Sequence, residues 1–135
     1  MARAADYAHS GFKSDLMDIH LIRNARAFIG TTSGLTNVAV SLGIPSAIVN
    51  GITTDCQLWT ENVRFVLKPV RLADGTMLTQ RQLTSSPWRR RVFDAAVLGR
   101  HGGRPVHNAA DEILEAVKEV GSSRERAVGG IREGL

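Results

Sequence analysis

The chain has little cysteine, and this scarcity excludes several kinds of site. Cys56 is the only cysteine, so no internal disulfide can form and no thiolate metal cluster is available. The four histidines, His9, His20, His101 and His107, show neither an HExxH motif nor another paired metal spacing. We therefore expect no bound metal. We also expect no catalytic role for Cys56, because the sequence identifies no basic partner that would activate its thiol.

Long hydrophobic runs are missing as well. No apolar run approaches the roughly 20 residues that a membrane span needs, and the first residues, MARAADYAHS, include no apolar signal region. An apolar content of 43% over 135 residues is nevertheless enough for the buried core of one domain. We expect a cytoplasmic protein without a transmembrane segment, or a soluble part of something larger.

Acidic residues are too few to balance the basic ones in one segment. Residues 87–107 contain a single acid, Asp94, and five arginines: Arg89, Arg90, Arg91, Arg100 and Arg104. The segment has one notable aromatic pair and no helix-turn-helix, zinc or RNA-binding signature, so we expect no nucleic-acid partner. The first interpretation of the arginines is a solvated basic face, and the second is a site for phosphates or an acidic membrane surface.

Residues 25–50 form the most informative stretch. Residues 27–30 are a short apolar run that suits a buried strand, and they are followed by a polar turn. Apolar residues at helical spacing come next, and Gly43 can take the left-handed conformation that ends a helix. A second apolar run at 47–49 is closed by Asn50. The stretch predicts a βαβ unit.

The polar turn of this unit, Thr31-Thr32-Ser33-Gly34, is the candidate binding site. In a right-handed βαβ unit it lies at the carboxyl edge of the sheet, where open α/β sheets bind ligands. Unpaired amides and the dipole of the following helix favour an anion such as phosphate, and Gly34 permits its close approach. From these four residues alone, a helix cap without a ligand is the simpler interpretation. The turn has neither GxGxxG spacing nor the lysine of a Walker loop.

The remaining predicted elements complete a small domain. Four helices are expected: over 14–24 with Ser14 as N-cap, from Thr79 with Gln82 in a capping box, around 92–97, and from the N-cap Asn108 to Gly121. We also expect a third strand over 63–67, a helical turn over 56–60 and a turn over 73–76. Three strands leave unpaired edges, so we expect a homodimer or a partner that supplies the missing part. The domain should cover residues 1–121, with 122–135 as a flexible tail.

With its flanks, the turn resembles the donor-binding half of two-domain GT-B glycosyltransferases. FIGTTSGLTNVAVSLGIPSAIVN is similar to their strand, SG turn, helix, GxP break and next strand. Residues 6–35, 67–83 and 108–120 together resemble bacterial putative glycosyltransferases of unassigned substrate. The fold implied is α/β, a Rossmann-like three-layer domain with a small, mostly parallel sheet, resembling half of a GT-B fold.

The resemblance also implies a binding site for a nucleotide sugar. The residues implied in holding the donor diphosphate are Thr31, Thr32, Ser33, Gly34 and Leu35. Asn50 would border the base or the sugar, and Asn37 is a further candidate at the position where related enzymes often carry a histidine. No metal or other cofactor is required, because the helix terminus and basic side chains offset the charge on the leaving diphosphate. No catalytic residue can be assigned.

Sugar transfer by this chain alone is not expected, because the sequence does not supply the acceptor-binding half or its base. Two alternatives remain open. One is a non-catalytic assembly or regulatory module of the same fold. The other is a relative of nucleotide-sugar epimerases, which would need an acid and a histidine near the sugar; the acids on offer are Asp55 and Glu61.

Overall fold

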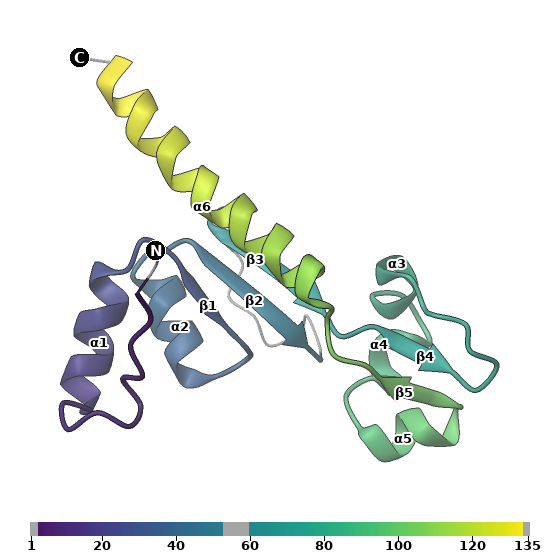
Figure 1. Cartoon of the computed structure of the whole chain (residues 1–135). Helices are drawn as coiled ribbons and strands as arrows, with labels where there is room; N and C mark the ends of the chain where they lie inside the picture. The colour runs from purple at the N-terminus through teal and green to yellow at the C-terminus, as the bar shows by residue number, and fades with distance from the viewer. Residues whose placement is uncertain (1–2, 53–59, 134–135) are drawn as a thin grey trace.

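The structure is a computed structural model that describes residues 3–52 and 60–133 (Figure 1). Its main sheet has three parallel strands in the order β1-β2-β3, which are β1 (Phe28–Gly30), β2 (Ser46–Gly51) and β3 (Val63–Leu67). The predicted strands are therefore confirmed, and the chain is a mixed α/β protein with a small parallel sheet. The helical turn predicted at 56–60, with Cys56, falls almost entirely outside the described residues.

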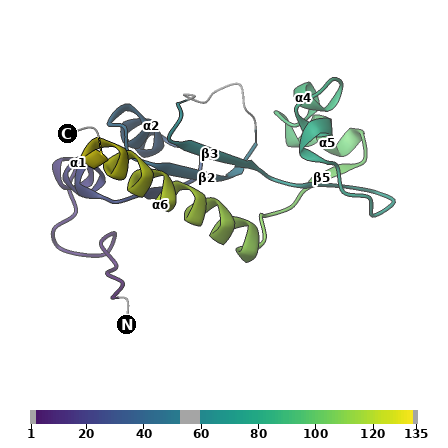
Figure 2. The same cartoon turned by 90° about the horizontal axis from the view of Figure 1, so that it is seen from above.

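Helices cover both faces of this sheet (Figure 2). α2 (Gly34–Ser41) lies on one face, with α1 (Asp15–Asn24) packed beside it through Ile22 and Ala39. α6 (Ala110–Glu133) crosses the other face over β2 and β3. Ala47 and Val49 of β2 pack there against apolar residues of α6. β2 is the central strand, and this double cover explains why it is buried along most of its length.

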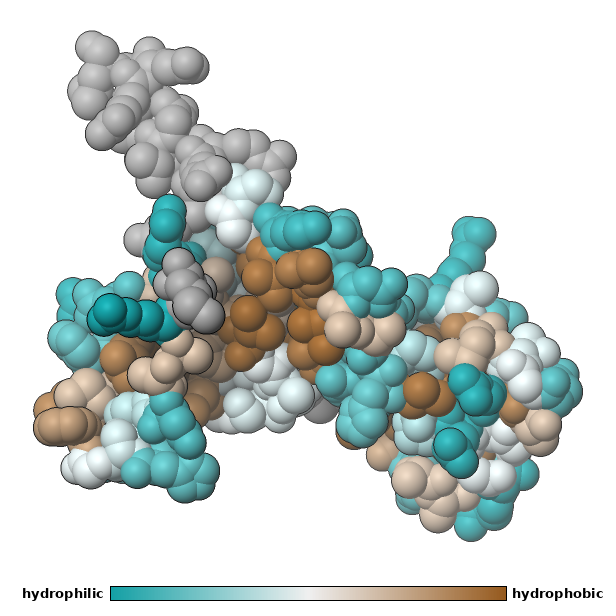
Figure 3. Space-filling view, viewed as in Figure 1, coloured by the Kyte–Doolittle hydropathy of each residue, from teal (hydrophilic) through white to brown (hydrophobic). Residues whose placement is uncertain are grey.

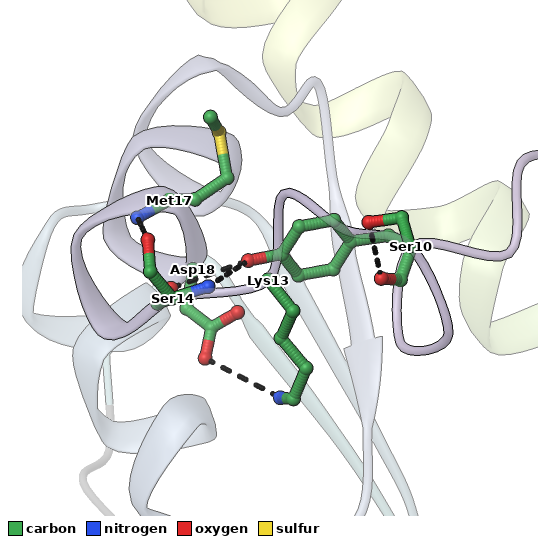
Figure 4. Close-up of polar contacts among 6 residues, drawn as sticks. Ser10, Lys13, Ser14, Met17 and Asp18 are labelled. Carbon is green, nitrogen blue, oxygen red and sulfur yellow. Dashed lines mark hydrogen bonds and ion pairs between the residues drawn. The ribbon is translucent and has the colours of Figure 1, made fainter.

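Ser14 is the N-cap of α1, as predicted, and Figure 4 shows its surroundings. Its Oγ accepts a hydrogen bond from Met17 N at 3.1 Å. The Tyr7 hydroxyl donates to Ser14 O and accepts from Ser14 N, at 3.2 and 3.1 Å. Lys13 also forms an ion pair with Asp18 of the first turn at 3.9 Å. These contacts hold the segment before α1 against the start of the helix.

Residues 68–107 form a second region, which we call the basic module. It contains the antiparallel strands β4 (Val70–Leu72) and β5 (Gly103–Pro105) and the short helices α3 (Gln80–Leu83), α4 (Trp88–Arg91) and α5 (Ala95–Arg100). Its core joins Val70, Leu78, Leu83 and Leu98 to Leu67, the last residue of β3. The basic module therefore lies beyond the carboxyl end of β3, to one side of the sheet (Figure 1).

Several local predictions for this region are confirmed, but β5 was not predicted. The Thr79–Gln82 capping box is present, and Gly75 has the positive φ of 86° that suits the turn over 73–76. β5 is only three residues long and begins at the second glycine of the pair Gly102-Gly103, a sequence that usually marks a break in regular structure. Gly103 is required there because a Cβ would lie 2.6 Å from Leu98 Cδ1.

Two predictions for the last helix are wrong. Asn108 does not cap α6; its side chain is used in bonds to β2 and β3, and Glu112 Oε2 instead accepts from Ala109 N at 2.8 Å. The helix also continues through Gly121 to Glu133. A glycine inside a helix costs only about 1 kcal/mol, which the packing of Ala116 and Val120 on the sheet can offset. The predicted boundary at residue 121 thus lies inside α6, and the flexibility of 122–135 stays a prediction.

Apolar surface gathers in the middle of the molecule, in the region of the sheet and α6, on the face seen in Figure 3. Exposed apolar side chains of these elements include Ile29 on β1 and Leu114 on α6. The strand order also leaves β1 and β3 as the two edges of the sheet. Sheet edges and exposed apolar side chains are features that other chains can bind.

Candidate functional site

The predicted binding turn is an exposed bend between β1 and α2. β1 ends at Gly30, residues 31–33 make the bend, and α2 begins at Gly34. Because β1 is parallel to β2, the bend lies at the carboxyl edge of the sheet, as predicted. Thr31, Thr32, Ser33, Gly34 and Leu35 are all exposed there, and so is Asn37 in the first turn and a half of the helix.

Ser33 is the N-cap of α2, which confirms the helix-cap interpretation. Its Oγ accepts from Thr36 N at 3.4 Å, and its carbonyl accepts the bond that opens the helix, from Asn37 N at 3.3 Å. The amides of Gly34 and Leu35 come before that first intrahelical bond, so the helix itself gives them no acceptor. The cap and an anion site are compatible, because they use different amides.

Thr36 completes the bend, although sequence reasoning did not include it. Thr36 is 1% exposed. Its hydroxyl donates to Thr31 O at 2.5 Å, and the same oxygen, Oγ1, lies 3.2 Å from Ser33 Oγ. These contacts fix the backbone on both sides of residues 32–35. Its place three residues after the N-cap is the signal that could have identified it, since side chains at that position reach back to the cap.

The two glycines around the bend have different roles. A Cβ on Gly30 would lie 2.7 Å from Phe28 Cε1 and 3.3 Å from Thr36 Oγ1, so Gly30 is required for packing. A Cβ on Gly34 would have no atom of the described residues within 4 Å. Gly34 is therefore not needed for packing, and its lack of a side chain leaves space over the start of α2.

Asn50 lies at the carboxyl end of β2, on the same edge of the sheet, but its oxygen has a structural partner. Asn50 N donates to Asn108 Oδ1 at 2.6 Å, and Asn108 N donates to Asn50 Oδ1 at 2.7 Å. Asn108 Nδ2 also donates to Leu67 O at 2.9 Å. The backbone of Asn50 has a φ of 54°, a conformation that asparagine tolerates better than most residues. Asn50 and Asn108 together thus join the ends of β2 and β3 to the residues just before α6.

Of the two acids considered for epimerase chemistry, only Glu61 is described, and it is not placed at this edge. Glu61 precedes β3, so it lies at the amino end of the parallel strands, opposite the bend. Asp55 lies outside the described residues. Within the described ranges, no cluster of three or more His, Cys, Asp or Glu side chains is placed to hold a metal ion. None of the described helices combines the length and apolarity needed to cross a membrane.

The chain matches no protein-family model, no curated protein and no solved structure.

Proposed function

We propose that this chain is a glycosyltransferase-like donor-binding domain that holds the diphosphate of a nucleotide sugar at residues 31–35. One observation carries the proposal, namely the exposed start of α2 at the carboxyl end of β1, with open space over Gly34. A helix N-terminus acts on an anion like roughly half a positive charge, and its first amides point at the ligand. The parallel sheet with helices on both faces supports a Rossmann-like domain resembling half of a GT-B fold.

Each residue of the bend has a distinct role in this proposal. The amides of Gly34 and Leu35 donate to phosphate oxygens, and the hydroxyls of Thr31 and Thr32 supply further polar contacts at the same exposed bend. Ser33 holds the first turn of α2 in place through its cap. Asn37, one step along the helix, contacts the part of the donor beyond the diphosphate.

We propose donor binding for this chain and not sugar transfer by the chain alone. Transfer requires a cleft in which a donor-binding side faces an acceptor-binding side. Transfer requires a base that deprotonates the acceptor hydroxyl, and we assign that base to a partner or to a second copy of the chain. Stabilisation of the leaving diphosphate by helix amides requires no metal. Donor binding is therefore the measurable activity of this chain.

An NMR titration with UDP and GDP tests the proposal on the whole chain. Both nucleotides should shift the amide signals of residues 32–36. Gly34→Leu should raise the dissociation constant at least tenfold, about 1.4 kcal/mol, because its side chain fills the space that the phosphates need. Gly99→Leu is the matched control, since Gly99 is also an exposed helical glycine whose added Cβ meets no atom within 4 Å.

Unchanged spectra at millimolar nucleotide would contradict the proposal, as would equal weakening by the two glycine variants.

The open edges of the sheet favour a second candidate, a non-catalytic assembly module. Native mass spectrometry separates the two. A stable homodimer without nucleotide affinity supports the module, whereas a nucleotide-dependent complex with an acceptor-domain protein supports a split enzyme.

A further inference from the structure

A cavity of about 170 Å³ lies where the carboxyl ends of β2 and β3 meet the basic module. Its walls are mostly apolar. They include Ile52 after β2, Leu83 of α3, Phe93 just before α5 and Leu98 within α5. Among the described residues of the lining, Lys68, directly after β3, is the only charged one. None of residues 31–35 lines this cavity, so it is separate from the proposed donor site.

The cavity has a buried floor and an open mouth. Leu83 and Leu98 are buried in the core of the basic module, whereas Ile52 and Phe93 are 53% and 49% exposed. Large apolar side chains at a rim lose contact with water when a ligand covers them, and this burial contributes roughly 25 cal/mol for each Å². The cavity can therefore admit an apolar group from solvent.

Its size limits the ligand. A cavity of roughly 150 Å³ holds a benzene molecule, whereas drug-sized ligands occupy pockets of about 300 Å³ or more. One aromatic ring or one branched alkyl group fits, and a whole nucleotide does not.

Its charge selects among ligands of this size. Lys68 is half-buried, and no carboxylate of the described residues lies within ion-pair distance of its ammonium group. The basic module has eight Lys or Arg residues and two Asp residues, a net charge of +6, whereas the whole chain carries +4. A cation at the edge of an apolar cavity, inside a region of positive charge, favours an anion with an apolar body.

We propose that this cavity binds a small apolar carboxylate of about the size of benzoate, with the ring or alkyl group against Leu83 and Leu98 and the carboxylate at Lys68. The inference does not depend on donor binding at residues 31–35, because the two sites share no residue. Either site can be present without the other.

The test uses benzoate as the probe, with benzyl alcohol as its neutral counterpart and acetate as an anion without the ring. The whole chain is titrated by NMR, and contacts are measured between benzoate ring protons and the methyl groups of Leu83 and Leu98. Benzoate should bind at least five times more tightly than benzyl alcohol, acetate should not saturate the site, and the ring should contact both leucines.

Two pairs of variants locate the site. Ala95 lines the mouth and is exposed, so Ala95→Trp should fill the cavity and weaken benzoate binding at least tenfold. The control is Ala96→Trp, at an exposed position of the same helix outside the lining, and it should leave benzoate binding unchanged. Lys68→Met should remove the preference for benzoate over benzyl alcohol, whereas Arg71→Met, at an exposed position of β4, should keep it.

Equal binding of benzoate and benzyl alcohol to the unmodified chain would overturn the role of Lys68. Benzoate contacts that avoid Leu83 and Leu98, or no saturation at tens of millimolar, would overturn the site itself. Melting temperatures of the two tryptophan variants show whether both fold, and the leucine contacts in the unmodified chain test the site even if one does not. UDP titration in parallel tests donor binding independently of this result.

Discussion

The sheet region and the basic module carry their candidate anion sites in different ways. Beside the bend of residues 31–35, positive potential comes from backbone amides at the start of α2, which are fixed by the helix and do not titrate. In the basic module the potential comes from side chains, and one of them, Lys68, lines an apolar cavity. Outside the module the chain carries a net charge of −2, the difference between +4 and +6. The two proposed sites therefore differ in their chemistry, with backbone amides holding the anion in one region and side-chain charge in the other.

The two regions also differ in how they are built. The sheet joins strands through crossover connections and is covered by long-range packing of α6, whereas the basic module has short elements and a core of its own. They meet at Leu67. Directly after the basic module, Asn108 bonds to Asn50 of β2, 58 residues away in the sequence, and to Leu67 O at the end of β3. Substitutions at this junction and within each region separate their contributions.

The largest effect is expected from Asn108→Ala, which breaks the junction. It removes the side-chain acceptor of Asn50 N and the donor to Leu67 O in a buried setting. Leaving buried partners unsatisfied costs about 1–3 kcal/mol for each group, so urea unfolding should show a loss of about 2–4 kcal/mol in unfolding free energy. Asn62→Ala, at an exposed position, is the control and should change it by less than about 0.5 kcal/mol. If Asn108→Ala lowered the unfolding free energy no more than Asn62→Ala does, the junction would not contribute to stability.

A smaller effect is expected from removing one helix cap in each region. Ser33→Ala and Thr79→Ala both delete an N-cap hydroxyl, so each should lower the unfolding free energy by about 1 kcal/mol. Only Ser33→Ala should also weaken UDP binding, by about 0.5–1.5 kcal/mol, because Ser33 organises the proposed diphosphate site. Urea unfolding and calorimetric titration on both variants measure these quantities. If Ser33→Ala and Thr79→Ala bound UDP with equal affinity, Ser33 would have a capping role but no role in UDP binding.

The smallest effect is expected from Asp74→Asn in the turn of the basic module. The amide of Thr76 donates to the Asp74 carboxylate at 2.8 Å and holds its pKa below the usual range. A lowered folded-state pKa stabilises the fold above the unfolded pKa of about 3.9, and this contribution is lost as the pH falls through the folded value. The unmodified chain should thus be more stable than the variant at pH 6, and the difference should shrink as the pH falls below the unfolded pKa of about 3.9. An unchanged difference across this range would rule out a contribution of the charge.

Much of the sheet region could be predicted from the sequence because its signals are local. Ser14 and Ser33 cap the helices that follow them, and Gly43 has the positive φ of 70° that ends α2. The first two predicted strands are short apolar runs, and the third, over 63–67, has apolar residues at alternate positions. The bend residues were placed at the correct edge for the same reason, because a parallel βαβ unit fixes where its first turn lies.

The basic module and the junction could not be predicted in this way. β5 is too short to give a pattern of its own and exists because Val70–Leu72 pairs with it across the module. The role of Asn108 was missed because its local setting is that of a helix cap, while its partners are distant in sequence. The cavity at Lys68 likewise combines residues from β3, α3 and α5 that share no local motif.

The sequence by itself determined where helices begin, where the parallel strands lie and which bend faces the carboxyl edge, because capping and hydrophobic spacing act over a few residues. Only the tertiary structure decided that α6 passes Gly121, that Asn108 joins two strand ends and that Lys68 borders an apolar cavity. These features depend on burial and on partners brought together by folding, and the energy of packing is large enough to override local preferences.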